Sequence, residues 1–197
     1  TTFRKAYGLA NLELNVVLKP EMVFRLGSLT KQFTAVAIFM LEEQGKLAID
    51  DDITKYLPDY PANGAHITIE HLLTHTSGIQ GYTETPTFAD VSRNDLSVQQ
   101  LIDLFKDLPL AFAPGEQFAY SNSGYVLLGA IIEKVSGMRY ADFVAKSIFE
   151  PLGMRNTSYD LNEQIVANRA SGYSRVDGSF RNAAYVSMTT PYAAGGL

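Results

Sequence analysis

The chain has 197 residues, of which 46% are hydrophobic and 19% charged, and its formal net charge is −5. This apolar content excludes a disordered chain, and the acidic balance argues against binding of the nucleic-acid phosphate backbone. Cysteine is absent, which excludes disulfides and cysteine nucleophiles, and no apolar run reaches the roughly 18 residues that a membrane-spanning helix needs.

The first third of the chain predicts extended segments followed by a helix. The stretch up to Leu18 has the composition of short strands, interrupted at Gly8. From Phe33 to Leu41 all residues except one are apolar, which predicts a helix buried on all sides. Gly45 follows this helix where a left-handed C-terminal cap is favoured.

The rest of the chain predicts further helices. A short one is expected within residues 50–61, and others begin at the caps Thr68 and Ser97, the first ending near residues 77–78. A longer helix carries apolar residues at helical spacing and ends at Gly137, and a short one around residues 143–149 follows it. Residues 80–96 are polar and predict a surface loop. No linker divides the chain, so we expect one α+β domain over residues 1–197, with a helical cluster packed on an antiparallel sheet.

Ser28 and Lys31 are the first candidates for chemistry. Residues i and i+3 share a helix face, with their Cβ atoms about 5–6 Å apart. A desolvated lysine has a lowered pKa and can remove the proton of a serine hydroxyl, while the helix N-terminus can stabilise an oxyanion. This spacing is also expected by chance in a chain of this length. A purely structural lysine, however, would avoid so apolar a helix.

Tyr120-Ser121-Asn122 precedes the longer amphipathic helix and is the second candidate. A tyrosine beside an ammonium group can serve as a base, and an asparagine can hold a substrate amide through its donor and its acceptor. The alternative is structural, with a tyrosine corner and Asn122 as the N-cap of the helix.

The three histidines, His66, His71 and His75, lie within ten positions of one another. His71 and His75 have the i, i+4 spacing of a metal-binding pair, but the H-E-x-x-H order is absent. A Ser-His-Asp triad is a further alternative, although the chain lacks a G-x-S-x-G elbow.

Together these segments resemble one family. Residues Phe24–Ala35 are similar to the nucleophile segment of serine beta-lactamase-related hydrolases, which include class C beta-lactamases, D-alanyl-D-alanine carboxypeptidases, D-aminopeptidases and beta-lactamase-like esterases. The similarity continues in the family's order through Gly45–Leu47, Asp50-Asp51, Tyr56–Pro58, His71–Gly78, Pro114-Gly115, Tyr120–Tyr125, Pro151–Met154 and Gly195-Gly196.

The resemblance implies a beta-lactamase/transpeptidase-like fold and a serine hydrolase that cleaves amides or esters without metal or cofactor. Ser28 would be the acylated nucleophile, Lys31 and Tyr120 would share the acid–base work, and Asn122 would hold the substrate amide. The histidines would be structural, with residues 75–78 shaping the floor of the site. Small molecules or peptides would be the substrates, and a periplasmic or extracellular location is expected.

One part of the family pattern has no match. The third motif, Lys-Thr-Gly or His-x-Gly, lies on a strand downstream of the tyrosine motif and is not found between Ser123 and Leu197. We therefore expect the chain to be incomplete at both ends, with sheet strands missing. The alternative is an inactive binding protein that keeps the fold, and a metallohydrolase using the histidines is a third reading.

Overall fold

A computed structural model of the protein describes residues 3–197. The chain divides into two compact units, one formed by residues 3–25 and 162–185 and the other by residues 26–161 and 186–197. Within the described residues, no helix is both long and apolar enough to cross a membrane.

The smaller unit contains the four strands of the described chain. β1 (Leu9–Asn11) pairs antiparallel with β2 (Val16–Val17), and β3 (Tyr173–Val176) pairs antiparallel with β4 (Ser179–Asn182). Asp177 and Gly178 join β3 to β4 and both have positive φ, as a tight two-residue hairpin requires. Since such hairpins pair locally, the described strands form two separate two-stranded sheets instead of the one sheet that the sequence predicted.

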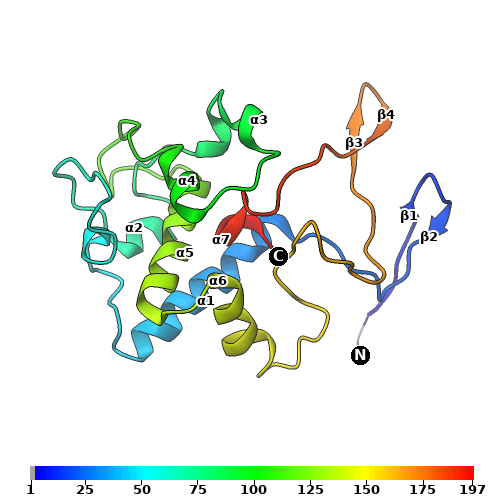
Figure 1. Cartoon of the computed structure of the whole chain (residues 1–197), viewed down its shortest axis with the longest axis horizontal. Coiled ribbons are helices and arrows are strands. Elements are labelled where there is room, and N and C mark those ends of the chain that lie inside the picture. The colour runs from blue at the N-terminus through cyan, green and yellow to red at the C-terminus, as the bar shows by residue number, and fades with distance from the viewer. Residues whose placement is uncertain (1–2) are drawn as a thin grey trace. The chain divides into compact units, whose positions relative to one another are not determined.

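The larger unit contains the helices (Figure 1). They are α1 (Thr30–Glu43), α2 (Ile69–Leu73), α3 (Phe88–Val91), α4 (Val98–Asp103), α5 (Asn122–Ser136), α6 (Tyr140–Val144) and α7 (Tyr192–Gly195). Single 3-10 turns form at Gly27–Leu29, Ile53–Lys55 and Tyr82–Glu84, and a π-helical turn at Ala145–Phe149 continues α6. α5 contacts α1, α2, α4, α6 and α7 and is the centre of this unit.

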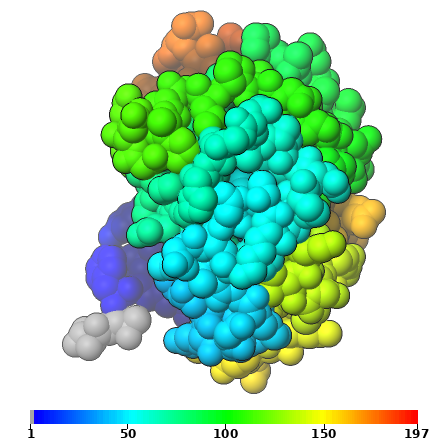
Figure 2. Space-filling model, turned by 90° about the vertical axis from the view of Figure 1, so that its left-hand side faces the viewer, coloured from blue at the N-terminus to red at the C-terminus, as the bar shows by residue number. Residues whose placement is uncertain are grey.

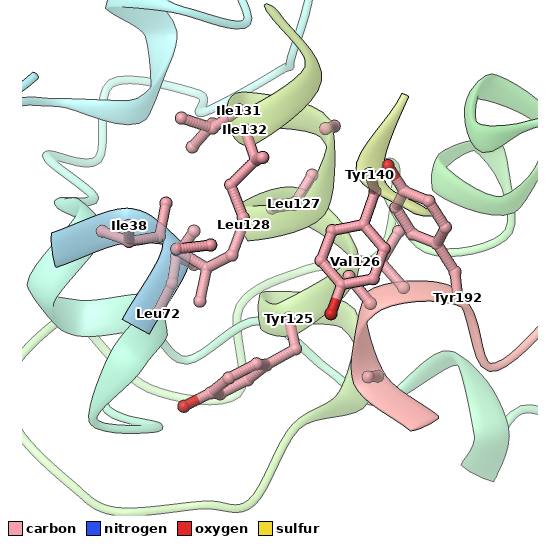
Figure 3. Packing of buried hydrophobic residues seen from close by; sticks show 14 of the residues in the cluster. Ile38, Leu72, Tyr125, Val126, Leu127, Leu128, Ile131, Ile132, Tyr140 and Tyr192 are labelled. Atoms are coloured by element: carbon pink, nitrogen blue, oxygen red, sulfur yellow. The ribbon is translucent and has the colours of Figure 1, made fainter. Parts of the chain in front are cut away.

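The core of the larger unit is built around α5 because most of this helix is apolar and buried. Its residues from Ser123 to Ile132 are buried without interruption. Figure 3 shows apolar side chains of α5 between Ile38 of α1 and Leu72 of α2 on one side and two tyrosine rings on the other. The rings of Tyr140 and Tyr192 lie 5.4 Å apart.

Four of the predicted helix ends, which depend on local backbone chemistry, are confirmed. The Thr68 and Ser97 side chains cap α2 and α4, each in a reciprocal capping box. Gly45 and Gly137 follow α1 and α5 with φ of 67° and 70°. The predicted end of the helix that starts after Thr68 is wrong by several residues, because α2 stops at Leu73 and His75 takes a φ of 59°.

The prediction that α1 is buried on all sides is wrong. Ala37, Ile38 and Leu41 are fully buried, whereas Val36 is 47% and Phe39 is 45% exposed. An apolar run predicts burial only where neighbouring elements cover every side of the helix. The helices that contact α1 within this unit, α5, α6 and α7, leave one apolar face of α1 exposed.

The segment between α1 and α2 is coloured cyan on the face that the space-filling view shows (Figure 2). Its 3-10 turn at residues 53–55 stands where the sequence predicted a short helix. The Asp51 carboxylate accepts bonds from Lys55 Nζ at 2.7 Å, Tyr56 Oη at 2.5 Å and the Ala48 amide at 2.8 Å. These bonds, that from Lys55 first, lower the pKa of Asp51 to about 2.

The predicted surface loop at residues 80–96 is anchored in the core. Tyr82 is only 1% exposed, its amide donates to Ser123 Oγ of α5 at 2.9 Å, and its hydroxyl donates to the Thr190 carbonyl at 2.5 Å. Thr83, the next residue, is therefore held at a fixed place beside the N-terminus of α5.

Candidate active site

Four residues from two segments of the chain meet in the larger unit. Ser28 belongs to the 3-10 turn before α1, and Lys31 lies in the first turn of α1. Tyr120 ends the extended segment before α5, and Asn122 is the first residue of that helix. All four are the residues that the sequence singled out, and the packing of α5 against α1 brings them together.

Ser28 Oγ lies between a phenol and an amine. Its distance to Tyr120 Oη is 2.6 Å, and Lys31 Nζ lies 3.3 Å away. The short distance to Tyr120 is that of a strong O–H···O hydrogen bond. Tyr120 Oη can therefore accept the Ser28 proton, while Lys31 Nζ donates to Ser28 Oγ.

Lys31 is buried, at 7% exposure, although its side chain ends in an amine. Nζ donates to Asn122 Oδ1 at 2.8 Å and to the Ala194 carbonyl at 2.7 Å. Burial lowers the pKa of Lys31, while the neighbouring Tyr120 acts in the opposite direction. Nζ also lies 4.8 Å from the centre of the Tyr120 ring and 5.3 Å from that of Tyr125.

The side-chain amide of Asn122 is oriented by bonds at both ends. Its Oδ1 accepts from Lys31, and its Nδ2 donates to Thr83 Oγ1 at 3.1 Å. The N-cap of α5 is Ser121, whose hydroxyl accepts from the Gly124 amide. The alternative that Asn122 caps the helix is therefore wrong, and its side chain is used at the Lys31 cluster instead.

The Ala194 carbonyl is held by a set of bonds around α7. The Leu26 amide donates to the Leu197 carbonyl at 2.7 Å, and the Leu197 amide donates to Thr30 Oγ1 at 3.1 Å. Thr34 Oγ1 donates to the Ala193 carbonyl at 2.7 Å. Sequence reasoning missed this acceptor, because a backbone carbonyl carries no side-chain signature.

The three histidines have three different environments. His66 is exposed, with Nε2 3.9 Å from Asp52 Oδ2, and His71 Nδ1 accepts from the Thr68 amide in the capping box of α2. His75 Nδ1 accepts from the Ser121 amide at 3.2 Å. Over residues 3–197, no group of three or more His, Asp or Glu side chains is arranged to hold a metal ion.

A cavity of about 190 Å³ opens beside Ser28 and Asn122. The other residues that line it come from the 3-10 turn before α1, from the loop that carries Tyr82, and from the segment around α7: Gly27, Tyr82, Thr83, Phe88, Val186, Thr190, Pro191, Ala194 and Gly195. Among these described lining residues none has a charged side chain. The cavity therefore suits an uncharged group of modest size.

The fold and these motifs define a beta-lactamase-like protein of the serine hydrolase type. The sequence model of the family described as Beta-lactamase matches residues 1–197, and the chain belongs to this family.

Relatives of known structure or activity agree with this membership. The chain is 42% identical over 178 residues to penicillin-binding protein 4* of Bacillus subtilis, covering 89% of this chain and 37% of the relative. It is 34% identical over 171 residues to esterase EstB of Burkholderia gladioli, covering 80% of this chain and 43% of the relative. The solved D-amino acid amidase of Ochrobactrum anthropi, in complex with L-phenylalanine amide, superposes with a TM-score of 0.83 at 29% identity, covering 96% of this chain and 55% of the amidase. The chain thus spans less than half the length of the two curated relatives.

Proposed function

We propose that this chain carries the nucleophile and the proton-transfer groups of a serine hydrolase that cleaves amide or ester bonds through a Ser28 acyl-enzyme. The observation that carries the proposal is the placement of Ser28 Oγ 2.6 Å from Tyr120 Oη and 3.3 Å from Lys31 Nζ. Nucleophilic serines require such a neighbouring base.

Lys31 is suited to gain and lose a proton without moving. Its bonds to Asn122 Oδ1 and to the Ala194 carbonyl use two hydrogens of Nζ, which are present in the ammonium and in the neutral amine alike. The remaining position of Nζ faces Ser28 Oγ and carries either a hydrogen or a lone pair. The lowered pKa of Lys31 makes the neutral amine more accessible.

The proposed reaction has two steps. Ser28 Oγ attacks the substrate carbonyl while its proton passes to the Lys31–Tyr120 pair, and the same proton is then delivered to the departing amine or alcohol as the C–N or C–O bond breaks. Water attacks the resulting ester in the second step, its proton passes to the pair, and Ser28 regains its hydrogen as the acid is released.

The substrate class follows from the cavity and the relatives. An uncharged lining with Phe88, Val186 and Pro191 suits an apolar acyl group. One relative is an esterase and another an amidase of D-amino acids. We therefore favour short esters or D-amino-acid amides over a dedicated lactamase activity.

The proposal is tested by labelling the full-length protein with a fluorophosphonate probe and with a fluorescent penicillin. We expect a covalent adduct on Ser28, located by peptide mass spectrometry, and no adduct in the Ser28→Ala variant. Absence of an adduct from the folded wild-type protein would instead support a binding protein that keeps the fold.

The substrate class requires a separate comparison of turnover. A chromogenic cephalosporin, a short-chain nitrophenyl ester and a D-amino-acid anilide report lactamase, esterase and peptidase activity, respectively. We expect the ester or the anilide to have the largest kcat/KM, and a dominant cephalosporin rate would contradict this preference.

A further inference from the structure

His75 is attached to both sides of Tyr120 by hydrogen bonds. Its backbone carbonyl accepts from the Ala119 amide at 2.9 Å, and its ring Nδ1 accepts from the Ser121 amide at 3.2 Å. The backbone at His75 has a φ of 59°, a left-handed conformation that is unfavourable for most residues other than glycine. Backbone strain of this kind persists where the surrounding contacts require it.

The imidazole of His75 also lies among aromatic rings. The centre of its ring is 4.6 Å from that of Tyr120 and 5.1 Å from that of Tyr125, both at interplanar angles of 35°. Phe118 meets the imidazole edge-on, with a separation of 5.9 Å. The ring of Tyr120 therefore has His75 beside it and Lys31 Nζ 4.8 Å from its centre.

The bond from the Ser121 amide requires a lone pair on Nδ1, so this nitrogen carries no hydrogen and Nε2 carries the hydrogen of the neutral imidazole. A protonated imidazole would place one N–H against another at this contact. The charged or titratable groups of the packed elements are Lys31 of α1, Tyr120 of the preceding segment and Tyr125 of α5. Burial first, and then the positive charge of Lys31, lower the pKa of His75.

We propose that His75 is a positioning residue: its neutral ring and its carbonyl hold the segment 119–121 so that the Tyr120 hydroxyl lies against Ser28 Oγ. The proposal rests on the function assigned above to Ser28, Lys31 and Tyr120. His75 would then affect the rate of acylation without binding a metal ion and without acting as the base of a Ser-His-Asp triad.

We therefore expect kcat to fall at acid pH because His75, which takes no part in proton transfer, becomes protonated. As the pH falls below the ordinary histidine value of 6.5, protonation removes the acceptor of the Ser121 amide and adds a second positive charge near Lys31. Tyr120 then loses its fixed position, and displacement of a reacting group by about 1 Å can reduce a rate about a hundredfold.

Two substitutions of His75 distinguish the effect of its hydrogen-bond acceptor from the effect of its aromatic ring. His75→Asn keeps an acceptor close to the Nδ1 position and tolerates positive φ, whereas His75→Phe keeps a ring and removes the acceptor. His71→Asn is the matched control, since His71 lies in α2 four residues before His75 and its Nδ1 accepts from the Thr68 amide.

The experiment measures kcat, KM and the pH profile of the full-length protein with the best of the three substrates, alongside its thermal unfolding. We expect His75→Phe to lower kcat about tenfold to a hundredfold with little change in KM. His75→Asn should keep more of kcat than His75→Phe, and its acid limb should move to lower pH. The acid limb of His71→Asn should match that of the wild-type protein.

The proposal is overturned if folded His75→Phe retains the wild-type kcat, or if His75→Asn keeps the wild-type acid limb. Should His75→Phe fail to fold, the acid limb of His75→Asn decides alone. Failure of the proposed function is recognised separately, because it would leave Ser28 of the wild-type protein unlabelled.

Discussion

Replacing Gly129 of α5 by alanine would place a methyl group inside the contact between α5 and α7. A Cβ at this position would lie 2.4 Å from Tyr192 Cε1 and 2.5 Å from Ala193 Cβ. Because Ala193 has no flexible side chain, the backbone of α7 must move away from α5. Ala194, the next residue of α7, supplies the carbonyl that accepts from Lys31.

The change in the free energy of unfolding is the difference between two opposing effects of the added methyl group. Alanine is favoured over glycine inside a helix by about 0.8–1 kcal/mol. Overpacking of a well-packed core costs about 1–3 kcal/mol, and two contacts this short belong at the upper end. We therefore expect Gly129→Ala to lower the free energy of unfolding by about 2 kcal/mol and to slow labelling of Ser28, since Lys31 loses a partner.

Gly124 of the same helix provides the matched control. A Cβ there would meet the Leu72 carbonyl oxygen at 3.5 Å, an ordinary van der Waals distance, so Gly124→Ala should be neutral or stabilising by up to about 1 kcal/mol. Urea unfolding of the full-length protein measures both variants. Equal stability of the two variants would refute the close approach of α5 and α7 at Gly129.

Three further predictions concern other contacts. Tyr120→Phe removes the hydroxyl next to Ser28 but keeps the ring, and should slow fluorophosphonate labelling about 10²–10⁴-fold without loss of fold; an unchanged labelling rate would exclude the hydroxyl from proton transfer. Thr34→Val removes the hydroxyl that bonds both the Ala193 carbonyl and the buried Tyr140 hydroxyl. This change should lower the free energy of unfolding, measured in urea, by about 2–4 kcal/mol. Thr34→Ser keeps a hydroxyl and should lose less. The pKa of Asp51 is lowered to about 2. Its carboxylate therefore stabilises the fold at pH values above the ordinary pKa of 3.8, and this contribution is lost as the pH falls from about 4 to about 2. Unfolding followed by circular dichroism should show that the stability of Asp51→Asn depends less on acid pH than that of the wild-type protein.

Four helix ends could be predicted from the sequence because they depend on neighbours along the chain. Thr68 and Ser97 cap helices through amides three residues away, and Gly45 and Gly137 supply left-handed backbone where the helices end. The end of α2 could not be predicted in this way. It depends on the conformation of His75, which is held by bonds to Ala119 and Ser121.

The members of the candidate site were predicted from residue types and order, whereas its geometry was not. Ser28 and Lys31 are close in sequence, and a helix brings them together whatever surrounds it. Thr83 and the Ala194 carbonyl carried no such signal. They contact Asn122 and Lys31 only because the loop around Tyr82 and the segment around α7 are anchored in the core.

The sequence by itself determined the starts of α2 and α4, the ends of α1 and α5, and which side chains could carry chemistry, since these depend on local geometry and side-chain type. Only the tertiary structure decided which atoms meet Lys31, which face of α1 stays exposed, and that a histidine ring lies beside Tyr120. The physical reason is that these contacts join segments distant along the chain, and they form only when α1, α5 and α7 pack against one another.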